Sequence, residues 1–289
     1  NKYVKKVKPQ IIFHLAAQPI ISKSYEEPFN TYGINSFGTL NLIEIIKRNK
    51  YIKSSVFITS DKCYESNNST KGFVESDKLG GIDPYSGSKA SAEIIVNTYY
   101  QSFFKNKIKT GIATARAGNV IGGGDWSKDR LIPDAIKSIK ENKQIIIRHP
   151  NFNRPWQHVL EPLYGYLILA YRLYKNPFKY SGPWNFGTER STVTSVKEIT
   201  QKIVSCWGKG KYKIINKKKF YEQTNLQLNI NKSKKYLKWK PKFNINQCIY
   251  ITVEWYRKVL EEKISVNKIT KDQILDYMKL NDKKKKKLK

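Results

Sequence analysis

Cysteine is scarce in this sequence: the 289 residues include only Cys63, Cys206 and Cys248. These three are odd in number, lie far apart along the chain and form no C-x-x-C pair. The spacing therefore predicts neither a disulfide framework nor a zinc site, and we expect no bound metal. Few, unpaired cysteines are typical of proteins from a reducing compartment, so the expected location is the cytoplasm.

Long apolar runs are also missing. No window approaches the roughly 18 apolar residues that a membrane-spanning helix requires, so no membrane partner is expected. Residues 1–6 are partly basic, but no apolar stretch follows them as it would in a secretory signal. The first strong apolar run, Ile11–Ala17, has the length of a buried strand.

Acidic residues are outnumbered, with 23 against 54 basic residues, which gives a formal net charge of +31. Such an excess can indicate nucleic-acid binding. Here most lysines are scattered, and only 217–219 and 283–287 form clusters. This distribution favours a solvated basic surface over a nucleic-acid partner. A basic surface also attracts an anionic nucleotide substrate by long-range steering.

The first half of the chain alternates strand-like and helix-like segments, which predicts an α/β fold with a doubly wound parallel sheet. Gly122-Gly-Gly-Asp interrupts this pattern and predicts a bend rather than a phosphate loop, since no Lys-Ser/Thr follows it. Beyond about Val266 the chain is polar and Lys-rich, and we expect a tail there. The predicted strands are 11–17, 55–60, 110–116, 144–148 and 183–187; the predicted helices are 35–47, 86–104, 131–140, 158–174, 196–207 and 245–262.

Tyr85 and Lys89 form the pair that carries most chemical information. They are four residues apart, about one helical turn, so both side chains share a face of the predicted helix. A tyrosine is a poor base at its usual pKa near 10, but a neighbouring ammonium stabilises the phenolate and lowers that pKa. Tyr85 can then exchange a proton with a sugar hydroxyl near neutral pH. Ligands of a doubly wound sheet bind at the carboxyl ends of its strands, which lie after Ala16, Ser60 and Arg116.

The motifs around these strand ends resemble those of the CDP-glucose 4,6-dehydratase family, within the extended short-chain dehydrogenases/reductases. Its most specific pieces are Thr59-Ser-Asp-Lys-Cys-Tyr and Ala115-Arg-Ala-Gly-Asn-Val-Ile-Gly-Gly-Gly-Asp-Trp. Asp83-Pro-Tyr-Ser-Gly-Ser-Lys and Arg154-Pro-Trp-Gln-His-Val-Leu-Glu-Pro fit the same family. The resemblance runs from about Pro9 to about Tyr256.

This resemblance implies NAD as the cofactor and a CDP-hexose as the substrate. Tyr85 would take the proton of the C4 hydroxyl as hydride passes from C4 to NAD, and Lys89 would lower the pKa of Tyr85 and bind the nicotinamide ribose. Ser60 would hydrogen-bond the C4 oxygen. Loss of the C5 proton and the C6 hydroxyl then releases water, and hydride returns to C6, which gives a 4-keto-6-deoxy sugar.

Asp61 and Lys62 would carry out the elimination. Asp61 is expected to protonate the departing C6 oxygen, for which it must be protonated. Related dTDP-glucose dehydratases have Glu where this chain has Lys62. A neutral, desolvated lysine could remove the C5 proton, and a charged one could stabilise the enolate. The sequence leaves both roles open.

The resemblance also implies the binding residues. Arg130 and Arg154 are candidates for the diphosphate, because a guanidinium binds phosphate oxygens in a bidentate fashion. His14 is expected to be a packed histidine beside the cofactor. A homodimer is expected for the whole enzyme. The cofactor-binding residues are expected to be Ala16, Ala17, Gln18, Asn35, Thr59, Tyr85 and Lys89; the substrate-binding residues are Asn119, Arg130, Leu131, Arg154 and Asn185.

A glycine-rich Gly-x-x-Gly-x-x-Gly turn, which opens complete enzymes of this family, does not occur in the sequence. We therefore expect a dinucleotide-binding domain truncated at its N-terminus, which binds NAD poorly and tends to aggregate. The expected domains are 1–121 with a return segment at about 155–187 for NAD, and 122–154 with 188–265 for substrate, followed by the tail at 266–289.

Two other functions stay open from the sequence. A nucleotide-sugar 4-epimerase would share Tyr85 and Lys89 but would not need the Asp61-Lys62 pair. A remnant without activity, including a basic nucleic-acid binder, would show no turnover and salt-sensitive binding to DNA or RNA.

Overall fold

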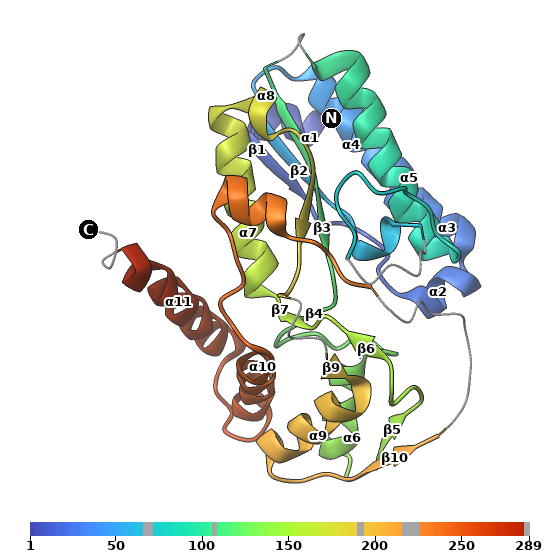
Figure 1. Cartoon of the computed structure of the whole chain (residues 1–289), viewed down its shortest axis with the longest axis vertical. Helices are drawn as coiled ribbons and strands as arrows, with labels where there is room; N and C mark the ends of the chain where they lie inside the picture. The colour runs from blue at the N-terminus through green and yellow to red at the C-terminus, as the bar shows by residue number, and fades with distance from the viewer. Residues whose placement is uncertain (66–71, 106–108, 190–193, 216–225, 286–289) are drawn as a thin grey trace. The chain divides into compact units, whose positions relative to one another are not determined.

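The computed structural model describes residues 1–65, 72–105, 109–189, 194–215 and 226–285, with side chains up to Leu280. The chain forms two compact units (Figure 1). Each unit is assembled from three separate segments of the sequence. The sheet unit comprises Asn1–Gly118, Leu163–Gly187 and Leu226–Lys240, and the second unit comprises Asn119–Pro162, Thr188–Asn225 and Pro241–Lys289.

A parallel sheet of four strands lies at the centre of the sheet unit. Its order is β1 (Ile11–His14), β2 (Ser54–Ile58), β3 (Gly111–Ala117) and β8 (Gly182–Phe186). Every neighbouring pair is parallel, so the carboxyl ends of all four strands lie at one edge of the sheet. The predicted strand 11–17 ends earlier than expected, at His14, and leaves Ala16 and Ala17 in the following loop.

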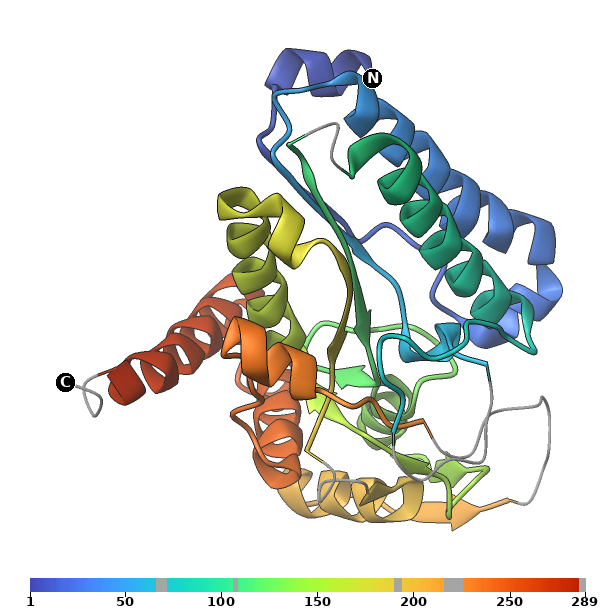
Figure 2. The ribbon, with the colours of Figure 1, turned by 45° about the horizontal axis from the view of Figure 1, so that its top comes forward.

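Helices cover both faces of this sheet (Figures 1 and 2). On one face α4 (Gly38–Arg48) and α5 (Pro84–Tyr99) form a core with Phe57 of β2. On the other face α7 (Leu160–Lys175) packs against Val56 of the same strand. Consecutive residues of β2 are therefore buried on opposite faces, which is typical of a parallel sheet covered by helices on both sides. The predicted α/β fold with a doubly wound sheet is confirmed.

Helix α5 begins where its sequence requires. The side chain of Asp83 accepts a hydrogen bond from the Ser86 backbone N–H at 2.9 Å, and Pro84 occupies the first helical turn. An aspartate cap followed by proline is a strong helix start, because the aspartate oxygen accepts from a backbone N–H of the first turn and proline has no N–H that would need a partner. This start places Tyr85 in the first turn and Lys89 one turn later.

Short elements complete the sheet unit. Several of them are single turns that connect the strands to the longer helices. They are α1 (Lys2–Val7), α2 (Ile21–Glu26), α3 (Pro28–Tyr32), a π-helical turn at Gly33–Phe37, a 3-10 turn at Asp61–Cys63, a π-helical turn at Tyr100–Phe104, α8 (Pro177–Tyr180) and a π-helical turn at Ser233–Leu237.

The second unit is built from helices around one apolar core. Its helices α6 (Leu131–Lys140) and α9 (Val196–Trp207) begin and end at the predicted residues. Both α9 and α10 (Ile245–Leu260) start with a capping box, in which the cap side chain and the third helical side chain bond each other's backbone N–H. The short strands pair as β4 (Val120–Ile121) with β7 (Gln157–His158), β5 (Ile145–Ile147) with β10 (Tyr212–Ile214), and β6 (Asn153–Arg154) with β9 (Thr194–Ser195).

The structure divides the chain at residues other than the expected domain boundaries. Residues 155–162, expected in the return segment of the NAD domain, belong to the second unit. Residues 226–240 were expected in the substrate domain, but they belong to the sheet unit. The reason is apolar packing: Trp239 lies against Phe186 of β8 with ring centroids 5.0 Å apart, and Leu228 packs against Tyr64. The assignment of cofactor and substrate to the two units stays a prediction.

The C-terminal region contains a helix that the sequence prediction missed. Helix α11 (Val266–Lys285) buries Ile269 and Tyr277 in the second unit. The indole of Trp255 in α10 donates a hydrogen bond to the Thr270 hydroxyl of α11 at 2.9 Å. The tail prediction failed because these buried residues are spaced along a stretch dominated by lysine and other polar residues.

A buried carboxylate fixes α11 to its own unit. Glu161 is fully buried, and its Oε1 accepts hydrogen bonds from the backbone N–H groups of Lys242 and Phe243 at 2.6 and 2.7 Å. Its Oε2 accepts a hydrogen bond from the Tyr277 hydroxyl at 2.7 Å. Burial raises the pKa of Glu161 above its ordinary value, while these donors act in the opposite direction.

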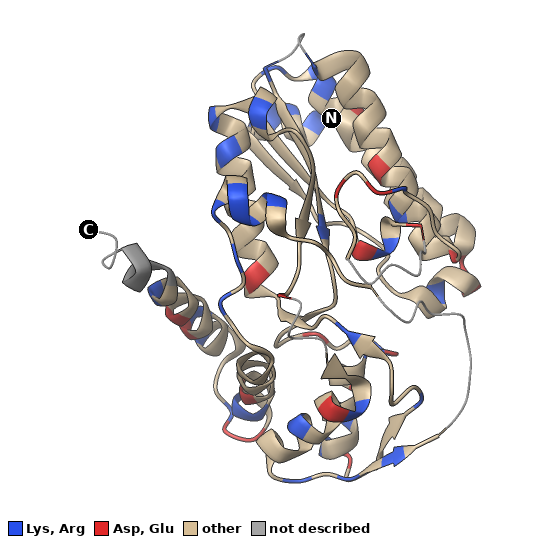
Figure 3. Cartoon of the chain, viewed as in Figure 1, with Lys and Arg blue, Asp and Glu red and all other residues tan. Residues whose placement is uncertain are grey.

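Lysine and arginine residues are distributed along the helices, strands and loops of both units (Figure 3). None of the helices in the described ranges combines the length and the apolar character needed to span a bilayer.

We expect Tyr277→Phe to lower the free energy of unfolding by about 1.5–3 kcal/mol, because it removes a buried hydrogen bond to a carboxylate. Urea denaturation followed by circular dichroism measures this change. Tyr250→Phe is the matched control, since Tyr250 in α10 is 54% exposed. Equal stability of the two variants would show that the Glu161–Tyr277 bond does not anchor α11.

Candidate active site

Tyr85 and Lys89 lie together on the buried face of α5. Tyr85 is 8% exposed and Lys89 is 5% exposed. The Lys89 ammonium donates a hydrogen bond to the backbone oxygen of Ile58, the last residue of β2, at 3.2 Å. The pair therefore lies at the carboxyl edge of the sheet, where a doubly wound fold binds its ligand.

The environment of Lys89 favours partial loss of its proton. Burial lowers the pKa of Lys89 to about 8, and the negative charge of Glu93 opposes this by raising it. The Lys89 side chain is therefore mostly charged at pH 7 and loses its proton as the pH rises through about 8.

The turn that follows β2 brings Ser60, Asp61 and Lys62 to the same edge. The Ser60 hydroxyl donates to Asp61 Oδ1 at 3.0 Å and accepts a hydrogen bond from the Lys62 backbone N–H at 3.2 Å. Ser60 and Asp61 are buried and Lys62 is half-buried. Helix α5 packs against this turn, so the structure brings all five predicted catalytic residues together in the sheet unit.

Asn35 and Gln18 are both predicted to bind the cofactor. The hydrogen bonds that the structure describes for them are made to other groups of the protein. Asn35 Oδ1 accepts from the Gln18 backbone N–H at 2.8 Å, and its Nδ2 donates to the Gln18 backbone oxygen and to the Ser88 hydroxyl. These bonds connect the loop after β1 to α5. In the same loop Ala16 is exposed and Ala17 is half-buried, so small side chains leave the backbone accessible.

His14, the last residue of β1, packs edge-on against Phe57 with ring centroids 5.6 Å apart. Burial lowers its pKa, and the Lys89 charge lowers it further. A neutral packed imidazole is the result, next to the proposed proton-transfer groups.

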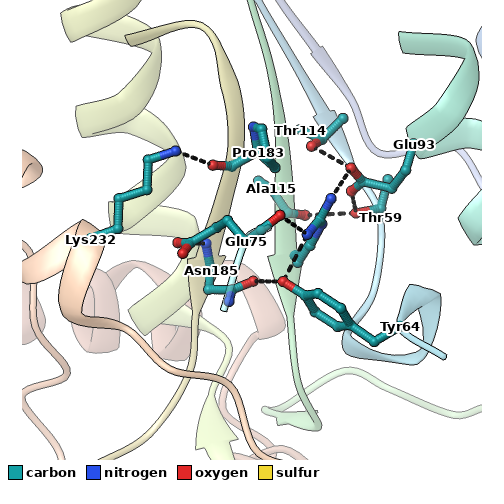
Figure 4. Close-up of polar contacts among 10 residues, drawn as sticks. Thr59, Tyr64, Glu75, Glu93, Thr114, Ala115, Pro183, Asn185 and Lys232 are labelled. Carbon is teal, nitrogen blue, oxygen red and sulfur yellow. Dashed lines mark hydrogen bonds and ion pairs between the residues drawn. The ribbon is translucent and has the colours of Figure 1, made fainter. Parts of the chain in front are cut away.

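A buried ion pair joins α5 to β3 (Figure 4). Glu93 of α5 and Arg116 of β3 are each 3% exposed and are joined by an Nη2–Oε2 contact of 2.7 Å. The Glu93 carboxylate also accepts hydrogen bonds from the hydroxyls of Thr59 and Thr114. Thr59 was predicted to contact the cofactor, and its hydroxyl has two described acceptors, the Glu93 carboxylate and, at 3.5 Å, the Ala115 backbone oxygen.

The same network continues to Asn185 of β8. Arg116 Nη1 donates to the Tyr64 hydroxyl at 2.7 Å, and that hydroxyl donates to Asn185 Oδ1 at 2.8 Å. Asn185 Nδ2 donates to the backbone oxygens of Phe73 and Asn229. Asn185 is fully buried, and its amide connects β8 to the segments around Phe73 and Asn229; its predicted substrate contact stays a prediction.

The other predicted substrate residues belong to the second unit. Asn119 accepts a backbone hydrogen bond from Gln157, and Leu131 is the first residue of α6. Arg130 forms an ion pair with Asp125 at 2.9 Å, and its side chain is 36% exposed. The Arg154 side chain is 3% exposed, with its guanidinium 5.3 Å from the Phe152 ring centre. Of the two arginines, only Arg130 presents its side chain at the surface of this unit.

Sequence reasoning missed Glu93. The signal was present, because Tyr85, Lys89 and Glu93 are spaced by four residues and therefore lie along one helix face.

In the part of the chain that the structure describes, His, Cys, Asp and Glu form no group of three that could hold a metal ion.

Comparisons with known proteins agree with this arrangement. A family model described as GDP-mannose 4,6 dehydratase matches residues 1–252. A CDP-glucose 4,6-dehydratase of Salmonella typhimurium is 41% identical over 280 residues, which cover 95% of this chain and 78% of that protein.

Solved structures show the same fold. The dTDP-glucose 4,6-dehydratase of Bacillus anthracis, determined in complex with NAD, is 25% identical with a TM-score of 0.75 over 90% of this chain and 76% of that one. The UDP-glucose 4-epimerase of Thermotoga maritima is 21% identical with a TM-score of 0.77, over 90% and 81% of the two chains, and shows the fold alone. The sequence match decides between these relatives, and the chain belongs to the nucleotide-sugar 4,6-dehydratases of the GDP-mannose 4,6 dehydratase family.

Proposed function

We propose that this chain converts CDP-glucose to CDP-4-keto-6-deoxyglucose, with NAD as the cofactor. The observation that carries the substrate is the 41% identity to a CDP-glucose 4,6-dehydratase across 95% of the chain. The structure supports the chemistry by grouping Tyr85 and Lys89 with the Ser60–Lys62 turn at the carboxyl edge of the sheet.

The residues at this edge fit a bound dinucleotide. The Lys89 ammonium offers donors to a ribose hydroxyl, and the small side chains of Ala16 and Ala17 allow a flat ring to approach the backbone. The hydrogen bonds between Gln18 and Asn35 hold this loop in place. When bound, NAD supplies the acceptor and donor of hydride for an internal redox reaction.

Tyr85 is the proposed base for the C4 hydroxyl. The Lys89 charge stabilises its phenolate, and the Ser60 hydroxyl hydrogen-bonds the C4 oxygen as the ketone forms. The ketone acidifies the proton at C5, which prepares the elimination of water across C5 and C6.

Asp61 and Lys62 are the proposed residues for this elimination. Asp61, which is 2% exposed, would donate a proton to the departing C6 hydroxyl. Lys62 would either remove the C5 proton as a neutral amine or stabilise the enolate as an ammonium. Its half-buried position is compatible with both roles.

The nucleotide portion of the substrate is proposed to bind to the second unit. Asn119, Arg130, Leu131 and Arg154 stay the proposed contacts, with Arg130 the better placed for a diphosphate because its guanidinium is accessible. Binding would replace the Asp125 carboxylate as its partner. Asn185 also stays a proposed substrate contact, and Tyr64 fixes its side chain by donating a hydrogen bond to its Oδ1.

We also propose that the enzyme is a cytoplasmic homodimer. Around α4 and α5 the apolar side chains of Phe37, Ile94 and Phe103 are 62%, 54% and 40% exposed. We base the proposed dimer on these side chains, because exposed apolar patches mark protein interfaces. The three cysteines are free thiols, which supports a reducing compartment.

We expect Tyr85→Phe to lower dehydration of CDP-glucose by at least about 100-fold, because the proton acceptor is lost. Mass spectrometry of the product measures the loss of one water. Tyr180→Phe is the matched control, since Tyr180 of α8 is 8% exposed like Tyr85 and its hydroxyl is not assigned to the reaction. A Tyr85→Phe enzyme as active as this control would exclude Tyr85 as the base.

We expect Lys89→Met to abolish turnover and to make the protein more stable at neutral pH. The pKa of Lys89 falls from 10.5 to about 8 on folding, so burying its charge costs on the order of 3 kcal/mol at any pH below about 8. The cost disappears between about pH 8 and 10.5, so the variant's advantage should shrink over that range.

Chemical denaturation at pH 7 and at pH 10 tests this expectation. A Lys89→Met protein less stable than the wild type at pH 7 would show that the ammonium is not buried at an energetic cost.

A further inference from the structure

Tyr85, Lys89 and Glu93 form one continuous buried stripe along α5. The three residues follow one another at intervals of four, and they are 8%, 5% and 3% exposed. The stripe therefore joins the two proposed proton-transfer groups to a carboxylate that the reaction itself does not use.

Three donors from two strands converge on the Glu93 carboxylate. The Thr59 hydroxyl donates to Oε1, while the Thr114 hydroxyl and Arg116 Nη2 both donate to Oε2 at 2.7 Å. Thr59 directly follows β2, and the other two residues belong to β3. Glu93 thus connects α5 to the ends of both central strands (Figure 4).

The position of Thr59 gives this connection a functional consequence. The next residues along the chain are Ser60 and Asp61, which lie in the turn against α5. A single carboxylate therefore holds the helix that carries Tyr85 and Lys89 and the segment that carries Ser60 and Asp61. Displacements of about 1 Å between reacting groups can cost on the order of 100-fold in rate.

Stability alone does not explain a charged pair at this position. Taking Glu93 and Arg116 out of water is costly, and well-packed apolar residues often give equal or greater stability. Arg116 has further partners, since its Nη1 donates to the Tyr64 hydroxyl and to the Glu75 backbone oxygen.

We propose that Glu93 is a positioning residue for the dehydratase reaction. Its hydrogen bond with Thr59 fixes the position of Ser60 relative to Tyr85 and Lys89. This inference rests on the proposed function.

Glu93 has a second effect through its charge, because it raises the pKa of Lys89 against the effect of burial. The charged and titratable groups that face this stripe from neighbouring elements are His14 of β1, Cys63 of the turn after β2, Arg116 of β3 and Tyr166 of α7.

The first test is Glu93→Gln, which keeps the shape of the side chain and removes its charge. We expect kcat to fall about tenfold or more with KM for CDP-glucose within about twofold, because the reacting groups are misplaced and binding is not. We also expect the alkaline limb of the kcat profile to move to lower pH, because Lys89 loses its proton more easily without the nearby carboxylate. Wild-type kcat together with a wild-type pH profile would overturn the proposal.

A matched pair of variants covers the case in which Glu93→Gln does not fold. Thr59→Val and Thr114→Val each remove one hydroxyl donor to the same carboxylate, but only Thr59 leads into the Ser60 turn. We expect Thr59→Val to lower kcat about tenfold and Thr114→Val to stay within about twofold of the wild type. Equal effects of the two variants, or a raised KM for NAD at unchanged kcat in Thr59→Val, would contradict the positioning role.

A titration that needs no turnover separates this inference from the proposed function. Nuclear magnetic resonance of protein labelled with 13C at lysine Cε, with Lys89→Met to assign the signal, follows the Lys89 proton directly. A lower titration midpoint in Glu93→Gln supports the proposal even if the wild type is inactive on CDP-glucose, which would refute only the substrate. An unchanged midpoint would overturn the coupling between Glu93 and Lys89.

Discussion

The buried carboxylate of Glu93 is the contact on which the arrangement of the sheet unit depends most. It receives hydrogen bonds from Thr59, Thr114 and Arg116, and so joins α5 to the two central strands. Charges buried this deeply are stable only when each has a partner and its hydrogen bonds are satisfied. Removing one member leaves the others in an environment that cannot hydrate them, which makes the network cooperative.

The same principle operates in the second unit with different residues. Glu161 satisfies two backbone N–H groups and the Tyr277 hydroxyl, so a single carboxylate fixes both the segment before α10 and helix α11. Each unit thus contains one fully satisfied acidic group that joins segments distant in sequence. Apolar packing forms the body of each unit, and these polar contacts specify which segments meet.

Much of this fold follows from local sequence patterns. Strands and helices alternate in the first half, which predicts the parallel sheet, and α6 and α9 have amphipathic patterns that give their limits without error. Tyr85, Lys89 and the Ser60–Lys62 turn were predicted to lie together, because parallel strands end at one edge. Helix α11 was missed, since its buried contacts are few and lie among lysines, and their partners in α7 and α10 are far away in sequence.

The roles of single buried polar residues were harder to predict. Asn185 and Thr59 are predicted to contact ligands, which stays a prediction; what the sequence did not show is that their side chains also bond protein groups that only the folded chain brings near. Glu93 was overlooked because a glutamate in a helix is usually exposed. Sequence spacing shows which residues share a helix face, but burial by another strand is a property of the tertiary structure.

The most direct measurement is the fate of the C4 hydrogen during turnover by the enzyme. With CDP-glucose deuterated at C4 and NAD present, we expect a 4-keto-6-deoxy product that carries the deuterium at C6, because the hydride taken from C4 is returned within the same active site. An isomer that retains all its oxygen atoms, or no product at all, would contradict a CDP-glucose 4,6-dehydratase.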